Sequence, residues 1–250
     1  KSIMSIQLHA GSNLISFNID SDNPTVSSVL SSLDDNIIGL MGESEAAIFD
    51  TNLGWFGTLD SIKECKAYWI IVNEDDILFV NGLPSNRNTV CDLHAGSNLI
   101  GYPYRFPISI NTALPEDIGC SILGIIGEGI SSICIDENWV GSLSYLESSY
   151  GYWFIADEAI SIIFNGCDHQ ENCMDMARVI KSPIQLPEGY EYSQSTEQVF
   201  YFIDNIQFLD GTMITDTDWI LCYKGDKLIG ARQWSGMKTD IPAMGEDSQE

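Results

Sequence analysis

Basic residues are scarce in this sequence. Lys and Arg number 11 against 36 Asp and Glu in 250 residues, a formal net charge of -25. Such a chain repels nucleic-acid phosphates and anionic lipid surfaces, so we expect no nucleic-acid partner. The acidity favours a protein kept soluble in a salty medium, with calcium binding as the alternative. Two groups could supply oxygen ligands, neither with the spacing of an EF-hand loop: Asp20, Asp22 and Asn23, and Glu74, Asp75 and Asp76.

Long apolar runs are also missing. No stretch of about 18 apolar residues occurs, so we expect no insertion into a membrane. The start has no basic, then apolar, then small-residue pattern of a signal peptide. The sequence begins at Lys1 rather than Met and ends on a polar stretch at Glu250. We expect an excerpt or a processed product of a longer protein.

The seven cysteines form no C-x-x-C pair and no zinc-finger spacing. Cys167 and Cys173 flank the polar stretch DHQEN, which a disulfide could close; two free thiols are the alternative. His169 lies between them, but one His and two Cys are an incomplete ligand set. We therefore predict a possible disulfide here and no metal site.

The octapeptide LHAGSNLI occurs at residues 8–15 and again at residues 93–100. Further matches follow at an offset of 85 residues, which becomes 84 further along. A repeat period of about 85 residues exceeds the roughly 20 to 50 residue periods of solenoids, so each copy is expected to be a small domain. The octapeptide is then the opening turn and strand of a module used twice, in residues 1–84 and 85–166. The matches are Gly39 with Gly124, Gly42-Glu43 with Gly127-Glu128, Trp55 with Trp139, Gly57 with Gly141, Leu59 with Leu143, and Tyr68-Trp69 with Tyr152-Trp153.

Alternating apolar residues predict strands within each module. ISFNI, at residues 15–19, places its apolar side chains on one strand face. YWIIV (68–72) and ILFV (77–80) are apolar on both faces, and residues 73–76 between them predict a buried β-hairpin. One short helix is expected between these strands. Val26, Val29, Leu30 and Leu33 have helical spacing, after Asn23 as N-cap and Pro24 in the first turn.

The pattern changes after Phe164. Residues 167–189 collect polar residues and prolines, as in a linker. A third β-sandwich-like unit is expected over residues 190–250, incomplete at its C-terminus. Its predicted strands are residues 200–208, 218–223 and 227–234, with turns at Asp210-Gly211 and residues 224–226. The fold class is therefore mainly β: two tandem homologous modules, each with a short helix, followed by the third unit.

Motifs of catalysis are weak. GESEA places Ser44 where a nucleophile elbow would, but the second module has Gly129 at that position. Residues 122–131 are glycine-rich without the G-x-G-x-x-G order of a dinucleotide site. Glu43 and Glu128 could act as glycosidase acids, yet they are one position in two modules. His9 and His94 are explained by neutral imidazoles bonded to nearby carbonyls. We expect no enzyme and no cofactor.

The tryptophans fall two to each unit. Trp69 and Trp153 lie in apolar runs and are expected in the core. Trp55 and Trp139 follow more polar residues, so they are the candidate binding residues, exposed as stacking platforms for a sugar or a protein partner.

Residues 5–164 resemble a module of large secreted and cell-surface proteins of bacteria and archaea, usually written Gly-Trp-Asn-Leu-Ile-Ser. The motif falls on residues 11–17 and 96–102. Ser12 and Ser97 stand where the family has tryptophan, and Gly101 where it has serine. LHAG-like starts and GIIGEG centres are similar to repeats in marine bacterial and marine phage structural proteins. The segment DWILCYKGDKLIGARQW resembles a further β module of such proteins, less specifically.

The resemblance implies a multi-module extracellular, cell-surface or virion protein. We therefore expect a non-enzymatic structural protein, such as a phage component, filament or adhesin, that associates with itself or with other structural subunits through module faces and strand edges. The alternative is a glycan-binding accessory module of a secreted protein or hydrolase.

Overall fold

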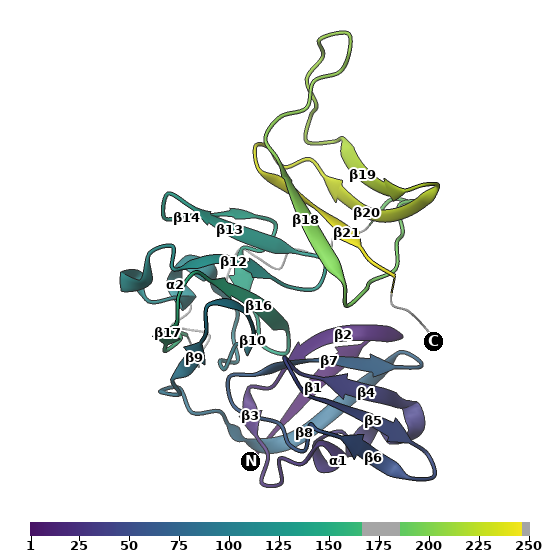
Figure 1. The fold of residues 1–250 in the computed structure, drawn as a ribbon, viewed down its shortest axis with the longest axis vertical. Helices are drawn as coiled ribbons and strands as arrows, with labels where there is room; N and C mark the ends of the chain where they lie inside the picture. The colour runs from purple at the N-terminus through teal and green to yellow at the C-terminus, as the bar shows by residue number, and fades with distance from the viewer. Residues whose placement is uncertain (167–185, 247–250) are drawn as a thin grey trace.

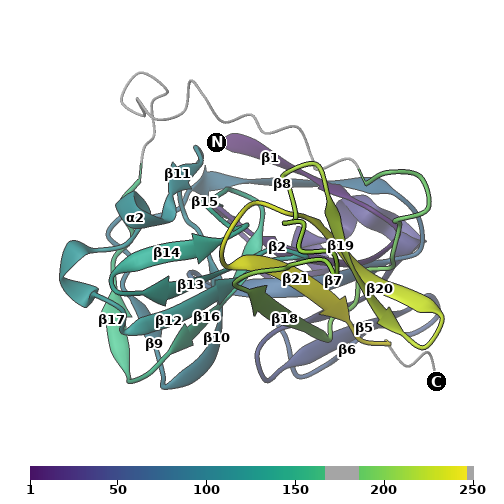
Figure 2. The same cartoon turned by 90° about the horizontal axis from the view of Figure 1, so that it is seen from above.

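The computed structural model describes residues 1–166 and 186–246 (Figures 1 and 2). The chain is mainly β, as the sequence predicts, with antiparallel sheets and a few short helices. The predicted Cys167–Cys173 disulfide and most of the predicted linker 167–189 lie outside the described residues. No helix in the described part is long and apolar enough to span a membrane.

The first module consists of two sheets around one core. A five-stranded sheet has the order β2-β7-β4-β5-β6, and a three-stranded sheet has the order β1-β8-β3. Leu40, Ile70 and Leu78 are completely buried between them. The strands are β1 (Ser2–Leu8), β2 (Gly11–Ser16), β3 (Ile19–Asp20), β4 (Ile37–Met41), β5 (Ala46–Asp50), β6 (Gly54–Gly57), β7 (Ala67–Val72) and β8 (Asp76–Pro84).

The expected helix is present but short. α1 (Val26–Val29) buries both of its terminal valines and continues into a 3-10 helix, η1 (Ser31–Asn36). Thr25, rather than Asn23, is the N-cap, because the Asn23 side chain accepts hydrogen bonds from the Thr25 backbone N–H and hydroxyl instead. The helix closes one end of the first-module core.

The hairpin predicted for residues 68–80 is wrong, although both strands exist. β7 pairs with β2 and β4, while β8 pairs with β1 and β3 in the other sheet. The connection between them crosses from sheet to sheet. Asn36 holds it there, donating from its side chain to the Glu74 carbonyl and accepting from the Glu74 N–H.

The second module repeats this arrangement. Its five-stranded sheet has the order β10-β16-β12-β13-β14, matching the first module strand for strand. The counterparts of β1 and β8 in the second module are the shorter strands β9 and β17, which pair with each other. The elements are β9 (Cys91–Leu93), β10 (Gly96–Gly101), β11 (Ile108–Ser109), α2 (Ile110–Ala113), η2 (Glu116–Ile118), β12 (Ile122–Ile126), β13 (Ser131–Ile135), β14 (Asn138–Gly141), β15 (Tyr145–Leu146), β16 (Gly151–Ala156) and β17 (Ile160–Ile162).

The third unit consists of two antiparallel strand pairs that pack on each other through β20 and β21. The predicted strands at residues 218–223 and 227–234 correspond to β19 (Trp219–Lys224) and β20 (Lys227–Gln233). The strand predicted at residues 200–208 ends early, as β18 (Gln198–Ile203), and β21 (Thr239–Met244) was not predicted. Between β18 and β19 the chain projects as a hairpin arm, residues 204–218 (Figure 1).

Candidate functional site

The repeated octapeptide forms the same turn in both modules. Asn13 braces it: its side-chain oxygen accepts the His9 N–H at 2.9 Å, and its amide nitrogen donates to the His9 carbonyl at 2.8 Å. Gly11 has a φ of +95°, which glycine adopts without steric cost. Asn98 and Gly96 repeat these features around His94. The turn places each histidine side chain at the border between the modules.

Each histidine reaches a glutamate of the other module. His9 Nε2 lies 2.6 Å from Glu128 Oε1, and Glu128 Oε2 accepts the Leu14 N–H at 3.0 Å. The reciprocal set is His94 with Glu43 at 2.7 Å, and the Leu99 N–H with Glu43 at 3.1 Å. Glu43 lies in the turn between β4 and β5, and Glu128 in the matched turn between β12 and β13. The Gly-Glu turn of one repeat is therefore the receptor for the octapeptide of the other.

The contact with Glu128 keeps His9 protonated at neutral pH. The hydrogen bond to Glu128 raises the pKa of His9 to about 9, against the opposing effect of partial burial. The pKa of His94 is also raised, first by the Ala95 carbonyl and then by Glu43. The expected carbonyl contact is confirmed, with His9 Nδ1 2.9 Å from the Ala10 oxygen. For His9 the expected neutral imidazole is wrong, because Glu128 stabilises its charge.

Backbone and apolar contacts complete this module junction. The Ser16 N–H donates to the Ser149 carbonyl and, at the matched place, the Gly101 N–H donates to the Cys65 carbonyl, both at 3.0 Å. Between these bonds lies a small apolar cluster. Trp69 is in this cluster with Trp153 packed against it, so both expected core tryptophans pack at the junction rather than inside a module. The cluster is Leu14, Ala67, Trp69 and Leu99, with Met41 and Trp153 packed on it.

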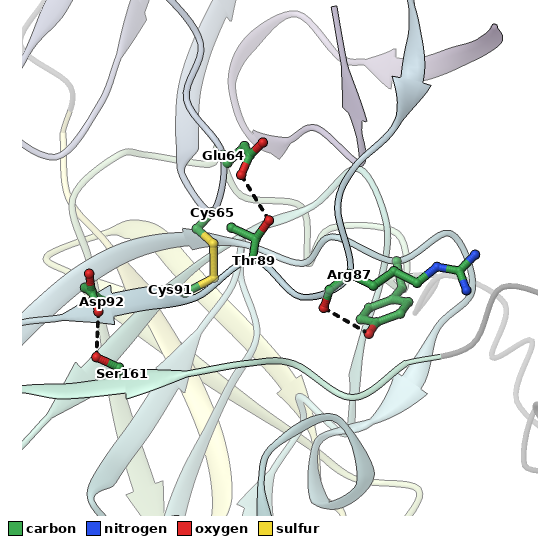
Figure 3. The surroundings of a disulfide bond; sticks show 8 residues. Glu64, Cys65, Arg87, Thr89, Cys91, Asp92 and Ser161 are labelled. Carbon is green, nitrogen blue, oxygen red and sulfur yellow. Dashed lines mark hydrogen bonds between the residues drawn. A yellow bond between two sulfur atoms is a disulfide. The ribbon is translucent and has the colours of Figure 1, made fainter.

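A disulfide crosses the same junction on one side. Cys65 precedes β7 of the first module and Cys91 lies in β9 of the second, with their Cα atoms 5.6 Å apart (Figure 3). The Glu64–Thr89 hydrogen bond lies beside it, at 3.0 Å. A second disulfide, Cys120–Cys134, lies within the second module. Neither pairing was predicted.

A buried ion pair of the third unit forms hydrogen bonds to the second module. Asp240 and Arg232 are both buried, with Arg232 Nη2 3.4 Å from Asp240 Oδ2. Asp240 Oδ1 accepts the Ser142 N–H at 2.7 Å, and Oδ2 accepts the Ser131 hydroxyl at 3.1 Å. Arg232 also donates to the Gly129 carbonyl at 2.5 Å. Burial raises the pKa of the Asp240 carboxyl, and Arg232 opposes that effect.

The hairpin arm carries exposed apolar side chains at its tip. Leu209 is fully exposed, and Phe208 and Met213 are each about half-exposed. The arm is nevertheless ordered by backbone bonds, from the Phe208 N–H to the Thr212 carbonyl and from the Gly211 N–H to the Phe208 carbonyl, both 2.9 Å. The predicted Asp210-Gly211 turn forms its end. A monomer gains nothing by presenting these side chains to water, so the tip is a candidate contact surface.

The predicted binding residues Trp55 and Trp139 lie on the outermost strands of the two large sheets. Both are half-buried and pack against their module cores, and the Trp55 ring lies 5.4 Å from that of Phe49. The structure does not bring them together with the other candidates. Their role in recognition stays a prediction.

The groups proposed for calcium are occupied by protein contacts. Asp22 pairs with Lys1, and Asp76 accepts from Asn36 at 2.9 Å. Asp75 accepts the Ala10 N–H at 2.8 Å. Within residues 1–166 and 186–246, no group of three or more His, Cys, Asp or Glu side chains could hold a metal ion.

Both nitrogens of each described histidine are engaged, which leaves His9 and His94 no position from which to activate Ser44 or another nucleophile.

A comparison of the chain with protein-family models, with curated proteins and with solved structures gave no significant match.

Proposed function

We propose that this chain is a non-enzymatic structural component of an extracellular or virion-surface assembly, and that it associates with further copies of itself through the hairpin arm. The observation that carries the proposal is the ordered arm with an apolar tip. Its side chains Phe208, Leu209 and Met213 lie in water while the rest of the third unit is docked on the second module.

The arrangement of the modules supports a mechanical role. Charged side chains join one unit to the next. His9–Glu128 and His94–Glu43 link the two modules, and Asp240 and Arg232 of the third unit form hydrogen bonds to the second module. The Cys65–Cys91 disulfide adds a covalent link between modules. Disulfides persist mainly in oxidising environments, which supports the proposed extracellular or virion location.

The acceptor for the arm is proposed on the first module of another copy. Ile48 in β5 and Phe56 in β6 are cross-strand partners, each 51% exposed on the face turned away from the core. Their counterparts in the second module, Ile133 and Val140, are less exposed. Arm and acceptor are different surfaces of one chain, so their contact is head-to-tail and grows into a filament unless a ring closes.

The electrostatics set the conditions for association. Each copy has a formal charge of -25, and the arm itself contains Asp204, Asp210, Asp216 and Asp218. Copies therefore repel at low ionic strength. Salt at sea-like concentrations screens charges over less than about 8 Å, so we expect assembly to strengthen as salt is added.

Sedimentation velocity and electron microscopy across a salt series test the proposal. Wild-type protein should form ordered oligomers or filaments at high salt, and Leu209→Asp and Ile48→Asp should each remain monomeric. Met237→Asp is the matched control, since Met237 is an exposed apolar residue of the third unit outside the arm. Dispersed wild-type monomers at high concentration and high salt would exclude self-assembly.

A glycan-binding accessory module is the second candidate, favoured by the outermost positions of Trp55 and Trp139 in their sheets. A glycan array separates the two. Binding that disappears in both Trp55→Ala and Trp139→Ala supports recognition of a sugar, and an array without binding removes this candidate.

A further inference from the structure

The first module contains a cavity of about 250 Å³. It lies between the end of β2, the short strand β3, helix α1 and strand β8. Its inner wall is apolar, with Phe17, Val29, Ile62 and Val80, and its rim is polar, with Asp20, Lys63 and Glu64 at the surface.

The internal repeat gives the matched residues of the second module. Phe17 corresponds to Tyr102 at the offset of 85 residues, and Val80 to Phe164 at the offset of 84. Tyr104 follows Tyr102 by two residues, as Ile19 follows Phe17.

In the second module these rings pack on one another. Tyr102 lies 5.7 Å from Phe164 and 5.6 Å from Tyr104 between ring centroids, and all three side chains are buried. The matched positions therefore hold packed aromatic rings in the second module, whereas in the first module Phe17 and Val80 line a cavity. Apolar walls hold water weakly, so an apolar group of suitable size would gain by entering the hollow.

The rim of the cavity favours a positive charge. Asp20 accepts a hydrogen bond from the Ser85 hydroxyl at 3.0 Å, and Glu64 accepts one from the Thr89 hydroxyl, also at 3.0 Å. Lys63 is already paired with Glu45 at 2.6 Å. Among the described residues, neither Asp20 nor Glu64 has a cationic partner. Burial raises the pKa of the Asp20 carboxyl, the Ser85 hydroxyl opposes that effect, and the nearby negative charge of Glu64 raises the pKa further. A cation bound between the two carboxylates would offset their mutual repulsion.

We propose that this cavity binds a small organic ammonium ion, with its apolar body against Phe17 and Val80 and its charged nitrogen at Asp20 and Glu64. The apolar wall provides the hydrophobic contribution to affinity, and the carboxylates select the cation over neutral molecules of the same shape. The site is separate from the hairpin arm, so it does not depend on the proposed assembly.

The probe is 2-phenylethylamine, with neutral 2-phenylethanol as its matched analogue, titrated into the full chain at millimolar concentration. Binding is followed by calorimetry and by NMR of the Val80 methyl groups and the Asp20 amide. We expect the amine to bind at least tenfold more tightly than the alcohol. Absence of a shift at Val80 with the amine, or equal binding of amine and alcohol, would overturn the proposal.

Two variants locate the binding. Val80→Phe introduces the residue found at the matched place in the second module and should abolish binding of both probes. Asp20→Asn should weaken the amine at least tenfold and leave the alcohol unchanged, and it keeps the fold because it preserves the side-chain size at a partly exposed position. Asp22→Asn is the control, since Asp22 pairs with Lys1 outside the cavity lining. Wild-type affinity of Asp20→Asn for the amine would refute the assigned contact.

Discussion

His9 of the first module and Glu128 of the second lie 2.6 Å apart, and His94 with Glu43 repeats that contact in the opposite direction. Each glutamate also accepts a backbone N–H from the strand that follows its histidine partner. The two identical octapeptides therefore each form contacts with the other module, in addition to the contacts within their own repeat.

Loss of one glutamate should weaken this junction. In Glu128→Ala, His9 loses its partner and the Leu14 N–H is left without an acceptor, so the free energy of unfolding should fall by about 1–3 kcal/mol. Denaturant unfolding measures the change. Glu158→Ala, at an exposed position of the same module, is the control and should stay within about 0.5 kcal/mol of wild type.

The junction should lose stability at alkaline pH. The pKa of His9 is about 9 in the folded chain and 6.5 without its partners, so its contribution is complete below pH 6.5 and is lost as the pH rises through 9. NMR titration of the His9 ring gives its pKa, and thermal unfolding across the same range gives the loss. His9→Gln should remove this part of the pH dependence. A His9 ring that titrates near 6.5 would contradict the ion pair.

Acid should weaken the contacts of Glu43, the glutamate that pairs with His94 at the junction. Burial alone would raise the pKa of Glu43, but the Leu99 N–H, His94 and Lys66 together outweigh it and leave that pKa below 4.5. Its contribution is therefore present above pH 4.5 and is lost as the pH falls through the folded value. Unfolding curves of wild type and Glu43→Gln should converge in acid. A constant difference between them down to acid pH would mean that Glu43 acts by packing alone.

Reduction of Cys65–Cys91 should destabilise the pair of modules. The bridge closes a sequence separation of 26 residues, for which chain entropy gives about 3 kcal/mol. The double variant Cys65→Ser with Cys91→Ser isolates this bond from Cys120–Cys134. Its melting temperature under oxidising conditions should lie below that of wild type. An unchanged melting temperature would mean that the noncovalent junction contacts already fix the modules.

Removal of the Asp240 carboxylate should release the third unit. Asp240→Ala leaves Arg232 buried without its partner, a change that typically costs about 3–5 kcal/mol. Hydrogen exchange gives a local readout, because the Ser142 N–H is bonded to Asp240. Its exchange should accelerate, while that of Thr58, the matched residue of the first module bonded to the Ala46 carbonyl, should not. Equal protection of the Ser142 N–H from hydrogen exchange in wild type and variant would refute the role of Asp240 in holding the third unit to the second module.

The sequence predicts the β class and most strands because period-two patterns report which face of a strand is buried. It fails where pairing depends on distant residues. β7 and β8 are adjacent and apolar, yet Asn36 directs the chain between them into different sheets. The internal repeat predicts the two modules. It also shows that the His and Glu positions are both repeated, which is consistent with the contacts between them. No pattern in the sequence specifies that each histidine pairs with the glutamate of the other copy.

The sequence pattern also could not predict the two disulfides or the contacts of Arg232 and Asp240 with the second module, for a similar reason. Cys65 and Cys91 belong to different modules, so their pairing follows from how the modules sit together. Arg232 and Asp240 are close in sequence, but their burial depends on the second-module turn at Gly129. The disulfide predicted between Cys167 and Cys173 from their short spacing lies outside the described residues.

The reciprocal exchange between the repeats has a bearing on how such chains lengthen. Each octapeptide occupies the turn of the other copy, so both binding positions are saturated within one pair. A third repeat would have no unoccupied Gly-Glu turn for its octapeptide to bind. In a solenoid, by contrast, each added unit exposes a new surface on which the next unit can pack. Gene duplication acting on this architecture would then add repeats two at a time, or add a different unit with a fastening of its own.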